Sequence, residues 1–256
     1  QLGGQPEPDP EFHLPMFIME DPPQHDEQRK VVAPMFTQRH LHKLEGLIRE
    51  RAGRILDQLP RNEEFNWVSH VSVELTAQML ATLFEIPQED RHLLIHWSDT
   101  TQNMSDPNYF DSVAEGFQEL WKCYEYFDAV WKERQQQSEG DDLISMLVHG
   151  ESTRNMPPEE YLGNILLLIV GGNDTTRNSI SGGVLALNDF PDEYDKLLAK
   201  PDLVPKMVPE IIRWQSPVAH MARTALEDTE LRGRRIAKGD RVVMWYVSGN
   251  RDESAI

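Results

Sequence analysis

The chain of 256 residues contains a single cysteine, more acidic than basic side chains and no long apolar run. One cysteine excludes a disulfide within the chain and fits the reducing environment of the cytoplasm. The formal net charge of −18 argues against binding to nucleic acid or to an anionic membrane surface. The longest apolar run is far shorter than the roughly 20 residues of a membrane-spanning helix, and no signal-peptide pattern opens the chain. We therefore predict a cytoplasmic protein without a transmembrane segment or a nucleic-acid partner.

Sequence patterns for nucleotide and zinc binding are incomplete. The pair Gly171-Gly172 lacks the lysine of a phosphate-binding loop and the third glycine of a dinucleotide-binding fingerprint. His92 and His96 have the spacing of a zinc-protease motif, but Leu93 stands where that motif needs its glutamate base. We therefore expect neither nucleotide nor zinc binding at these positions.

The most informative segment is LLLIVGGNDTT, residues 166–176. Its apolar part has no polar face, which predicts a helix surrounded by protein. Two glycines in such a helix cost roughly 1 kcal/mol each relative to alanine, so we expect them to make room for a bound group or for another element. Asp174 and Thr175 follow about one helical turn later and could deliver a proton to whatever lies there. Taken alone, the segment also fits a helix crossing or kink with Asp174 as a cap.

Several short motifs occur in a fixed order along the chain. They are Asp21-Pro22-Pro23 followed by His25-x-x-x-Arg29, then Gly171-Gly172-x-Asp174-Thr175-Thr176, Glu210-x-x-Arg213 and Ala222-Arg223-Thr224-Ala225. Together they resemble the signature of the cytochrome P450 monooxygenases over essentially the whole chain. The strings LLLIVGGNDTTRNS, EIIRWQSPVAHMARTA and VVMWYVSGNRDE are most similar to the bacterial alkane-hydroxylating branch, whose members oxidise terminal carbons of medium-chain alkanes and related lipids.

The resemblance implies a haem b group, iron protoporphyrin IX, whose iron is held by a cysteine thiolate. In the family this cysteine lies in a loop of the form Phe-x-x-Gly-x-x-x-Cys-x-Gly. The chain has no such loop, and Cys123 lies in the aromatic segment LWKCYEYF, where we expect a buried structural thiol. We therefore expect an internal fragment whose haem-ligating cysteine follows Ile256, and residues 1–256 alone should neither form a thiolate-ligated haem nor turn over substrate.

The resemblance also assigns roles to individual residues. His25, Arg29 and Arg223 would bind the two haem propionates, for which a guanidinium group offers several fixed donors. For each of the three taken alone, a surface salt bridge is the alternative. Thr175 would hold a hydrogen bond to the oxygen that is being activated, and Asp174 would relay protons from solvent.

Two further sets of residues have structural or substrate roles in this interpretation. Glu210 and Arg213 would belong to a buried network behind the haem, although alone they read as a surface pair worth about 0.2–0.5 kcal/mol. Pro209 departs from the pattern because proline inside a helix can cost roughly 3 kcal/mol, so either the helix begins later or this member is less stable. Apolar residues that would line the substrate pocket, with core packing as the alternative for each, are Leu167, Val170, Gly171, Ala219 and Met221.

We predict a mainly α fold with a small β component, the cytochrome P450 fold incomplete at both ends, in a single domain over residues 1–256. A central helix should span about residues 158–188 and be about 45 Å long. Residues 65–68 are predicted to form a short strand, and residues 218–246 have a rhythm of strands and turns. Other helices are predicted near residues 24–34, 40–59, 69–84, 88–101, 109–137, 142–149, 191–200 and before 214.

The resemblance thus implies a monooxygenase that hydroxylates unactivated C–H bonds of medium-chain alkanes or related aliphatic substrates with dioxygen. Electrons would come from NAD(P)H through a ferredoxin and a ferredoxin reductase. An apolar pocket suits such substrates because burial gains about 0.8 kcal/mol per methylene. Two alternatives stay open: a P450-like enzyme that uses peroxide or dehydrates a hydroperoxide, against which the Asp174-Thr175 pair counts, and a non-catalytic helical binding module.

Overall fold

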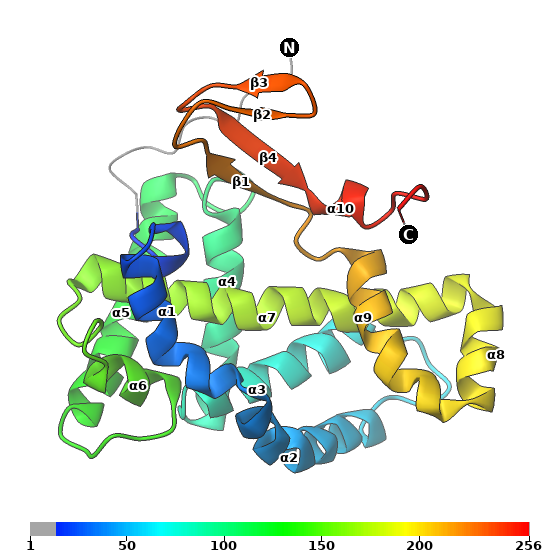
Figure 1. Ribbon diagram of the computed structural model, residues 1–256. Coiled ribbons are helices and arrows are strands. Elements are labelled where there is room, and N and C mark those ends of the chain that lie inside the picture. Colours follow the sequence, from blue (N-terminus) through cyan, green and yellow to red (C-terminus); the bar gives the residue numbers. More distant parts are fainter. Residues whose placement is uncertain (1–13, 256) are drawn as a thin grey trace. The chain divides into compact units, whose positions relative to one another are not determined.

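The computed structural model describes residues 14–255, which are mainly helical with two small sheets. They form two compact units, of which unit 1 ends at Asp174 and unit 2 begins at Thr175. The boundary lies inside α7 (Pro158–Asp189), the long central helix that the sequence predicts (Figure 1). The predicted mainly α class with a small β component is confirmed, and the single domain over residues 1–256 stays a prediction.

Unit 1 is built from helices whose starts are set by local capping. Thr37 accepts a hydrogen bond from the His40 backbone at 3.4 Å, and Ser112 accepts one from Glu115 at 3.2 Å. Asp142 accepts two, from the backbone N–H groups of residues 144 and 145, each at 3.0 Å. The helices are η2 (Phe17–Met19), α1 (Gln24–Val32), η3 (Ala33–Phe36), α2 (Gln38–Asp57), η4 (Val68–Val73), α3 (Glu74–Leu83), η5 (Gln88–Asp90), α4 (Arg91–Asn103), α5 (Val113–Arg134), α6 (Leu143–His149) and the first part of α7.

The predicted strand at residues 65–68 is wrong. Its aromatic and β-branched residues favour a strand, but Asn66 starts a helix instead. The Asn66 side chain accepts from the Ser69 backbone at 3.1 Å, and its carbonyl accepts from the His70 backbone at 3.0 Å. The chain then passes through the π-helix η4 directly into α3.

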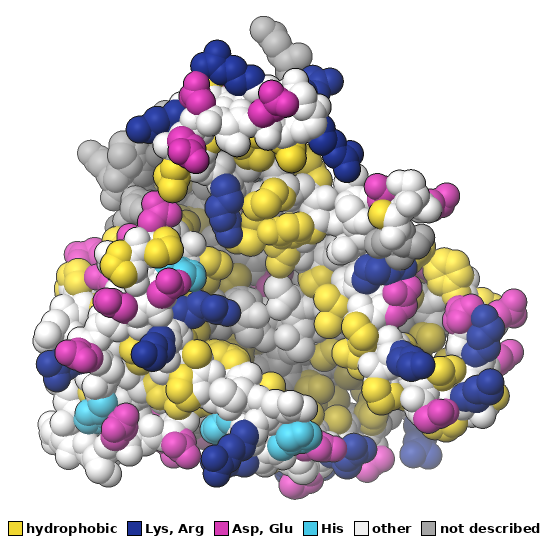
Figure 2. Space-filling view, in the orientation of Figure 1, with side chains coloured by type: hydrophobic (Ala, Val, Ile, Leu, Met, Phe, Trp, Pro, Cys, Tyr) yellow, Lys and Arg dark blue, Asp and Glu magenta, His cyan; other side chains and the backbone are white. Residues whose placement is uncertain are grey.

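The hydrophobic core belongs to unit 1. Every buried hydrophobic side chain among the described residues lies between Leu14 and Ile169. Phe84 and Phe127 meet at its centre, with their rings 5.3 Å apart. Unit 2 has large hydrophobic side chains on its surface instead, such as Leu226, which is 73% exposed. Figure 2 shows hydrophobic side chains at the surface, with acidic and basic side chains interspersed among them.

In the described part of unit 2, the second part of α7 is followed by three α-helices, one 3-10 helix and two two-stranded sheets. Strands β1 and β4 pair antiparallel with Ala222 opposite Val243, and β2 pairs antiparallel with β3. Arg232 and Gly233 join β2 to β3 with φ of 50° and 76°, the left-handed conformations of a tight hairpin turn. The predicted strand-and-turn segment is confirmed. The elements are α8 (Pro191–Ala199), η6 (Pro201–Leu203), α9 (Val204–Gln215), β1 (His220–Thr224), β2 (Thr229–Leu231), β3 (Arg234–Ile236), β4 (Arg241–Trp245) and α10 (Tyr246–Gly249).

Helix α9 runs from Val204 through Pro209 to Gln215. The explanation that this helix begins after Pro209 is therefore wrong. Proline has no N–H, so α9 lacks one of its internal hydrogen bonds at this position. None of the helices in residues 14–255 has the length and apolar character to cross a membrane.

Candidate active site

The adjacent glycines Gly171 and Gly172 of α7 have different surroundings. A Cβ on Gly172 would lie 2.7 Å from Leu80 Cδ2 on α3, so a larger residue there would require the buried Leu80 side chain to move. A Cβ on Gly171 would meet no atom within 4 Å among the residues described. Gly172 thus accounts for the predicted close approach of another element, and Gly171 gives α7 an exposed, unobstructed surface.

The surface at Gly171 continues along one face of α7. Leu167, Gly171 and Asp174 lie on this face because they are four and three residues apart. Leu167 and Val170 are half-buried, and Leu167 also packs against the core, which supports the core-packing alternative for that residue. The residues of α7 that are buried in the core of unit 1 are Leu162, Ile165, Leu166, Ile169 and Asn173.

Asp174 and Thr175 are half-buried residues in the interior of α7. The reading of Asp174 as a helix cap is therefore wrong, although the helix crossing in that reading does occur, at Gly172. The Ser179 hydroxyl donates to the Thr175 carbonyl at 2.7 Å, one turn further along the helix. A carboxylate that can exchange protons and a hydroxyl that can pass one on thus stand side by side beyond Gly171.

His25 and Arg29 lie one turn apart on α1. His25 is half-buried, and its Nδ1 donates to the Phe17 carbonyl at 2.7 Å, which leaves Nε2 for another partner. Arg29 is exposed, and within residues 14–255 its guanidinium makes no hydrogen bond or ion pair. In a chain with 43 acidic residues, a cation without a carboxylate partner is available to an anionic ligand.

Sequence reasoning missed the residues that hold α1 against α7. The fully buried Asn164 accepts from the Phe17 backbone at 2.8 Å and donates to Gln28 Oε1 at 3.2 Å. Gln28 in turn donates to Glu160 Oε1 at 2.5 Å. These bonds fix the positions of Phe17 and α1, and the Phe17 carbonyl in turn orients the ring of His25. In the sequence, the polar residue Asn164 next to an apolar run could have indicated such a buried contact.

Arg223, Met221 and Ala219 belong to unit 2. They alternate along β1 and the residue before it, so their side chains share one face of that strand. Arg223 is exposed and donates to the carbonyl of Ala222 at 2.8 Å, without a carboxylate partner in the described chain. The Ala219 carbonyl accepts from the Val247 backbone at 3.2 Å, which ties the start of β1 to α10.

Glu210 and Arg213 form the predicted pair on α9. Arg213 donates from Nε and Nη2 to the two carboxylate oxygens at 2.8 and 2.6 Å, and this bond lowers the pKa of Glu210. Its Nη1 donates to the Asn250 carbonyl, and Asn250 donates to the Ser216 hydroxyl at 2.9 Å. The side chain of Glu210 is 58% exposed, so solvent screens the pair in this structure. Ser216 and Asn250 were not predicted from the sequence.

An apolar pocket of about 450 Å³ lies within unit 2, at the end of α7 and beside α8 and α9. Its lining residues include Leu187, Phe190 and Trp214, together with the pair Glu210 and Arg213. None of the substrate-pocket residues predicted from the sequence lines it.

Cys123 is fully buried in the core of unit 1, as predicted, and burial raises the pKa of its thiol well above the ordinary value. A neutral thiol enclosed by apolar side chains cannot bind a metal ion. His92 and His96 have separate carboxylate partners, Glu74 at 3.6 Å and Glu119 at 2.9 Å.

Comparisons with known proteins agree with one another. The family model for Cytochrome P450 matches residues 13–255. Linalool 8-monooxygenase of Pseudomonas putida is 37% identical over 239 residues, which cover 93% of this chain and 59% of that protein. Methyl-branched lipid omega-hydroxylase of Mycobacterium tuberculosis is 35% identical over 249 residues, or 95% of this chain and 58% of that protein.

A solved structure, cytochrome P450-153 from Novosphingobium aromaticivorans, superposes with a TM-score of 0.89 at 44% identity. The match covers 99% of this chain and 62% of that one. The chain therefore spans about 60% of the length of the relatives that it matches.

Proposed function

This chain belongs to the cytochrome P450 family, and from that premise we propose that the whole protein is a haem-thiolate monooxygenase acting on aliphatic C–H bonds. The family resemblance and the fold that the sequence motifs imply are confirmed. The activity, the substrate and the partners of the whole protein are the proposal. One observation carries it: Asp174 and Thr175 follow, on one continuous helix, the glycine whose side is open.

Three side chains have the chemistry to bind the propionate groups of a haem. His25, Arg29 and Arg223 are cationic or can become so, and none has a carboxylate partner among the described residues. They would bind the two propionates, with the ring of His25 oriented by the Phe17 carbonyl. At Gly171 a flat group can approach the backbone of α7, because no Cβ stands in the way.

Cys123 does not fit as the ligand of the haem iron. Its thiol is enclosed in the core, and burial raises the pKa of the thiol. That the ligating cysteine follows Ile256 stays a prediction. When bound, the haem would supply the activation of dioxygen, which no amino-acid side chain can perform.

Asp174 and Thr175 would manage the protons of the reaction. Hydroxylation of one C–H bond by dioxygen consumes two electrons and two protons and forms one water, so protons would have to be delivered to the oxygen. Thr175 can hold a hydrogen bond to that oxygen or to a water beside it. Asp174, half-buried, can take a proton from solvent and pass it inward. A peroxide-using enzyme has no need of this pair, and a binding module would need neither residue.

We propose linear aliphatic compounds, medium-chain alkanes first among them, as substrates. The supporting features are the apolar side chains of Leu167, Val170 and Met221 and the small residues Gly171 and Ala219. Such a lining has no polar side chain that needs a hydrogen bond from the substrate. Burial of each substrate methylene gains about 0.8 kcal/mol of binding free energy. The names of two relatives, linalool 8-monooxygenase and methyl-branched lipid omega-hydroxylase, support aliphatic substrates in general.

Electrons would come from NAD(P)H through a ferredoxin and its reductase, and the protein would act in the cytoplasm. The single cysteine fits the reducing environment of the cytoplasm.

The test uses the haem-loaded full-length protein. We expect the carbon-monoxide difference band of a thiolate-ligated haem, and terminal alcohols from linear alkanes when NAD(P)H, ferredoxin and reductase are supplied. Steroids and polar compounds of similar mass serve as controls and should give far less product. Turnover with peroxide but not with the electron-transfer proteins would favour the peroxide-using alternative. Absence of the thiolate band would overturn both.

A further inference from the structure

Helix α3 holds α7 at the two residues that precede Asp174. Gly172 packs so closely on Leu80 that a Cβ there would lie 2.7 Å from Leu80 Cδ2. One turn earlier on α3, the Thr76 hydroxyl donates to Asn173 Oδ1 at 3.0 Å. Thr76 is 3% exposed and Asn173 is fully buried. Two successive residues of α7 therefore meet two successive turns of the same face of α3.

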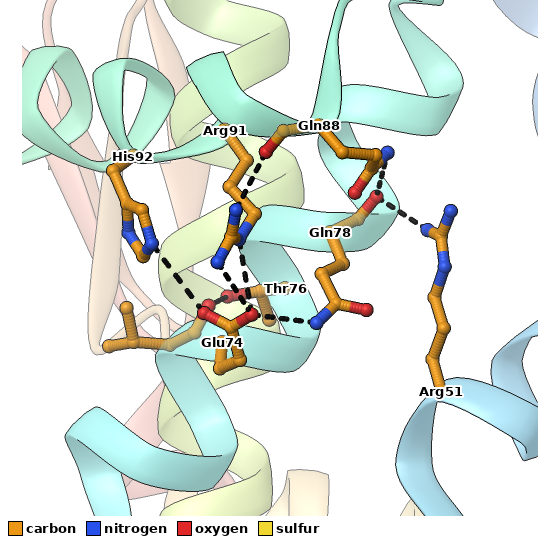
Figure 3. A network of polar contacts seen from close by, with 8 residues as sticks. Arg51, Glu74, Thr76, Gln78, Gln88, Arg91 and His92 are labelled. Carbon is orange, nitrogen blue, oxygen red and sulfur yellow. Dashed lines mark hydrogen bonds and ion pairs between the residues drawn. The ribbon is translucent and has the colours of Figure 1, made fainter. Parts of the chain in front are cut away.

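The other face of α3 is anchored by a polar network (Figure 3). Glu74 and Gln78 are each two residues from Thr76 along α3. Two residues correspond to about 200° around the helix axis, so Glu74 and Gln78 lie on the face opposite to Thr76. Glu74 Oε1 accepts from Arg91 Nε at 3.1 Å and from Gln78 at 2.6 Å. From α2, Arg51 donates to the Gln78 carbonyl at 2.6 Å. Helix α3 is thus fixed to α2 and α4 and forms a rigid support against which α7 is placed.

The Thr76–Asn173 hydrogen bond does not make the folded state more stable than an apolar contact at the same place would. The Asn173 Nδ2 is buried and has no hydrogen-bond partner in residues 14–255, so half of its amide is unsatisfied. A leucine has nearly the same size and would leave nothing unsatisfied in this interface. Either orientation of the amide keeps a bond to the Thr76 hydroxyl, which also lies 2.9 Å from the Ser72 carbonyl at the end of the π-helix. What the amide adds at this turn is a directional contact, beside the apolar packing that α7 shares with α3.

We propose that Thr76 and Asn173 are positioning residues whose hydrogen bond sets the rotation of α7 at Asp174. A fixed rotation keeps Gly171 and Asp174 on the open face, and Thr175 follows directly in the helix. Neither residue touches the reacting atoms, because Thr76 is buried on α3 and Asn173 lies on the buried side of α7. The inference rests on the proposed monooxygenase function. For that function, Thr76 and Asn173 would keep Asp174 and Thr175 in the orientation that proton delivery needs.

The principal variants are Thr76→Val, which removes the hydroxyl at constant shape, and Asn173→Leu. In the haem-loaded protein, each variant should lower the ratio of hydroxylated product to peroxide about threefold or more. A factor of this size corresponds to the free energy of one ordinary hydrogen bond. Haem content and the thiolate spectrum should stay at the wild-type level. Thr76→Ser should restore the ratio, and the double variant should be no worse than the worse single variant, because both remove the same bond.

A second readout needs no turnover. Amide hydrogen exchange of residues 170–176 should be faster in Thr76→Val than in the wild-type protein, since the helix gains freedom there. The matched control is Thr153→Val. Thr153 is also fully buried, and its hydroxyl donates to the Leu147 carbonyl at 2.6 Å, in the segment between α6 and α7. This control should lose stability yet keep the product ratio and the exchange of residues 170–176.

The outcomes separate the inference from the function on which it rests. Thr76→Val with the product ratio and hydrogen exchange of Thr153→Val would overturn the positioning role while hydroxylation stands. Additive losses in the double variant would also overturn it, because the two residues would then act separately. Failure of the proposed function looks different, since the wild-type protein itself would give no hydroxylated product.

Discussion

The carboxylate of Glu119 on α5 lies 2.9 Å from Nε2 of His96 on α4. Its second oxygen accepts from Lys122, and the side chain of Glu119 is only 23% exposed. The hydrogen bond from Lys122 is the main reason that the pKa of Glu119 is lowered, with the bond to His96 as a further cause. This carboxylate therefore links two helices of unit 1 and depends on its charge to do so.

Glu119→Gln should weaken this link in a pH-dependent way. Because the pKa is lowered in the folded state, the stabilisation is present above the pKa of the unfolded chain, near 4.3, and is lost as pH falls through the folded value. We expect the variant to lose about 0.5–1 kcal/mol at pH 7 and progressively less below about pH 4. Urea unfolding followed across this range measures it. Glu125→Gln, an exposed position on the same helix, should show no such trend.

Cys123 gives a prediction about the haem ligand. Its thiol is enclosed and its pKa is raised, so it should react with thiol reagents only when denaturant opens the core. When haem is added to a protein of these 256 residues, the carbon-monoxide difference spectrum should lack the thiolate band. A thiolate band that disappears in Cys123→Ser would show that this cysteine reaches the iron, contrary to its burial.

The sequence predicts the elements of this fold better than their partners. The apolar run predicts helix α7, and the glycine pair predicts that another element or a bound group approaches it. Both predictions succeed without knowledge of the fold because each pattern lies within one helix. The strand at residues 65–68 fails because capping by Asn66 outweighs the β-propensity of its neighbours.

Thr76 lies 97 positions from Asn173, and nothing in either segment alone indicates that they meet. Buried asparagines such as Asn164 and Asn173 can be recognised as unusual in an apolar helix, but the groups that they bind depend on packing. The same holds for Asn250, which joins the pair Glu210–Arg213 through a backbone carbonyl that any residue could supply.

Alanine at Gly171 and alanine at Gly172 should have opposite effects. Gly172→Ala places a Cβ 2.7 Å from Leu80 and should destabilise the protein by about 1–3 kcal/mol through overpacking. In the haem-free protein, Gly171→Ala meets no neighbour among the described residues and should stabilise α7 by roughly 0.5–1 kcal/mol, the ordinary helix preference for alanine. Thermal unfolding of the two variants, compared with the wild-type protein, measures the difference.

The same position also tests the substrate pocket. Gly171→Val adds a branched side chain on the open face of α7 and should shift the preferred chain length or the site of hydroxylation in the haem-loaded protein. Product profiles for a series of alkanes and fatty acids show such a shift. An unchanged profile in Gly171→Val would mean that this residue is not part of the pocket.

Thr175 and Asp174 carry the mechanistic prediction. Thr175→Ala should still bind haem, substrate and dioxygen, because none of these steps requires the hydroxyl. Coupling should fail instead: NAD(P)H is consumed at a rate comparable to wild type while peroxide accumulates in place of alcohol. Thr175→Ser keeps a hydroxyl and should retain much of the coupling.

Asp174→Asn separates the two roles. The amide is close in size to the carboxylate but cannot exchange protons with solvent, so the whole cycle should slow, with NAD(P)H consumption and product formation falling together. The two variants thus differ in which quantity changes: the ratio of product to NAD(P)H for Thr175→Ala, and the turnover rate for Asp174→Asn. If Thr175→Ala kept the wild-type ratio, the hydroxyl would be a packing feature of α7, and proton delivery would have to be sought elsewhere.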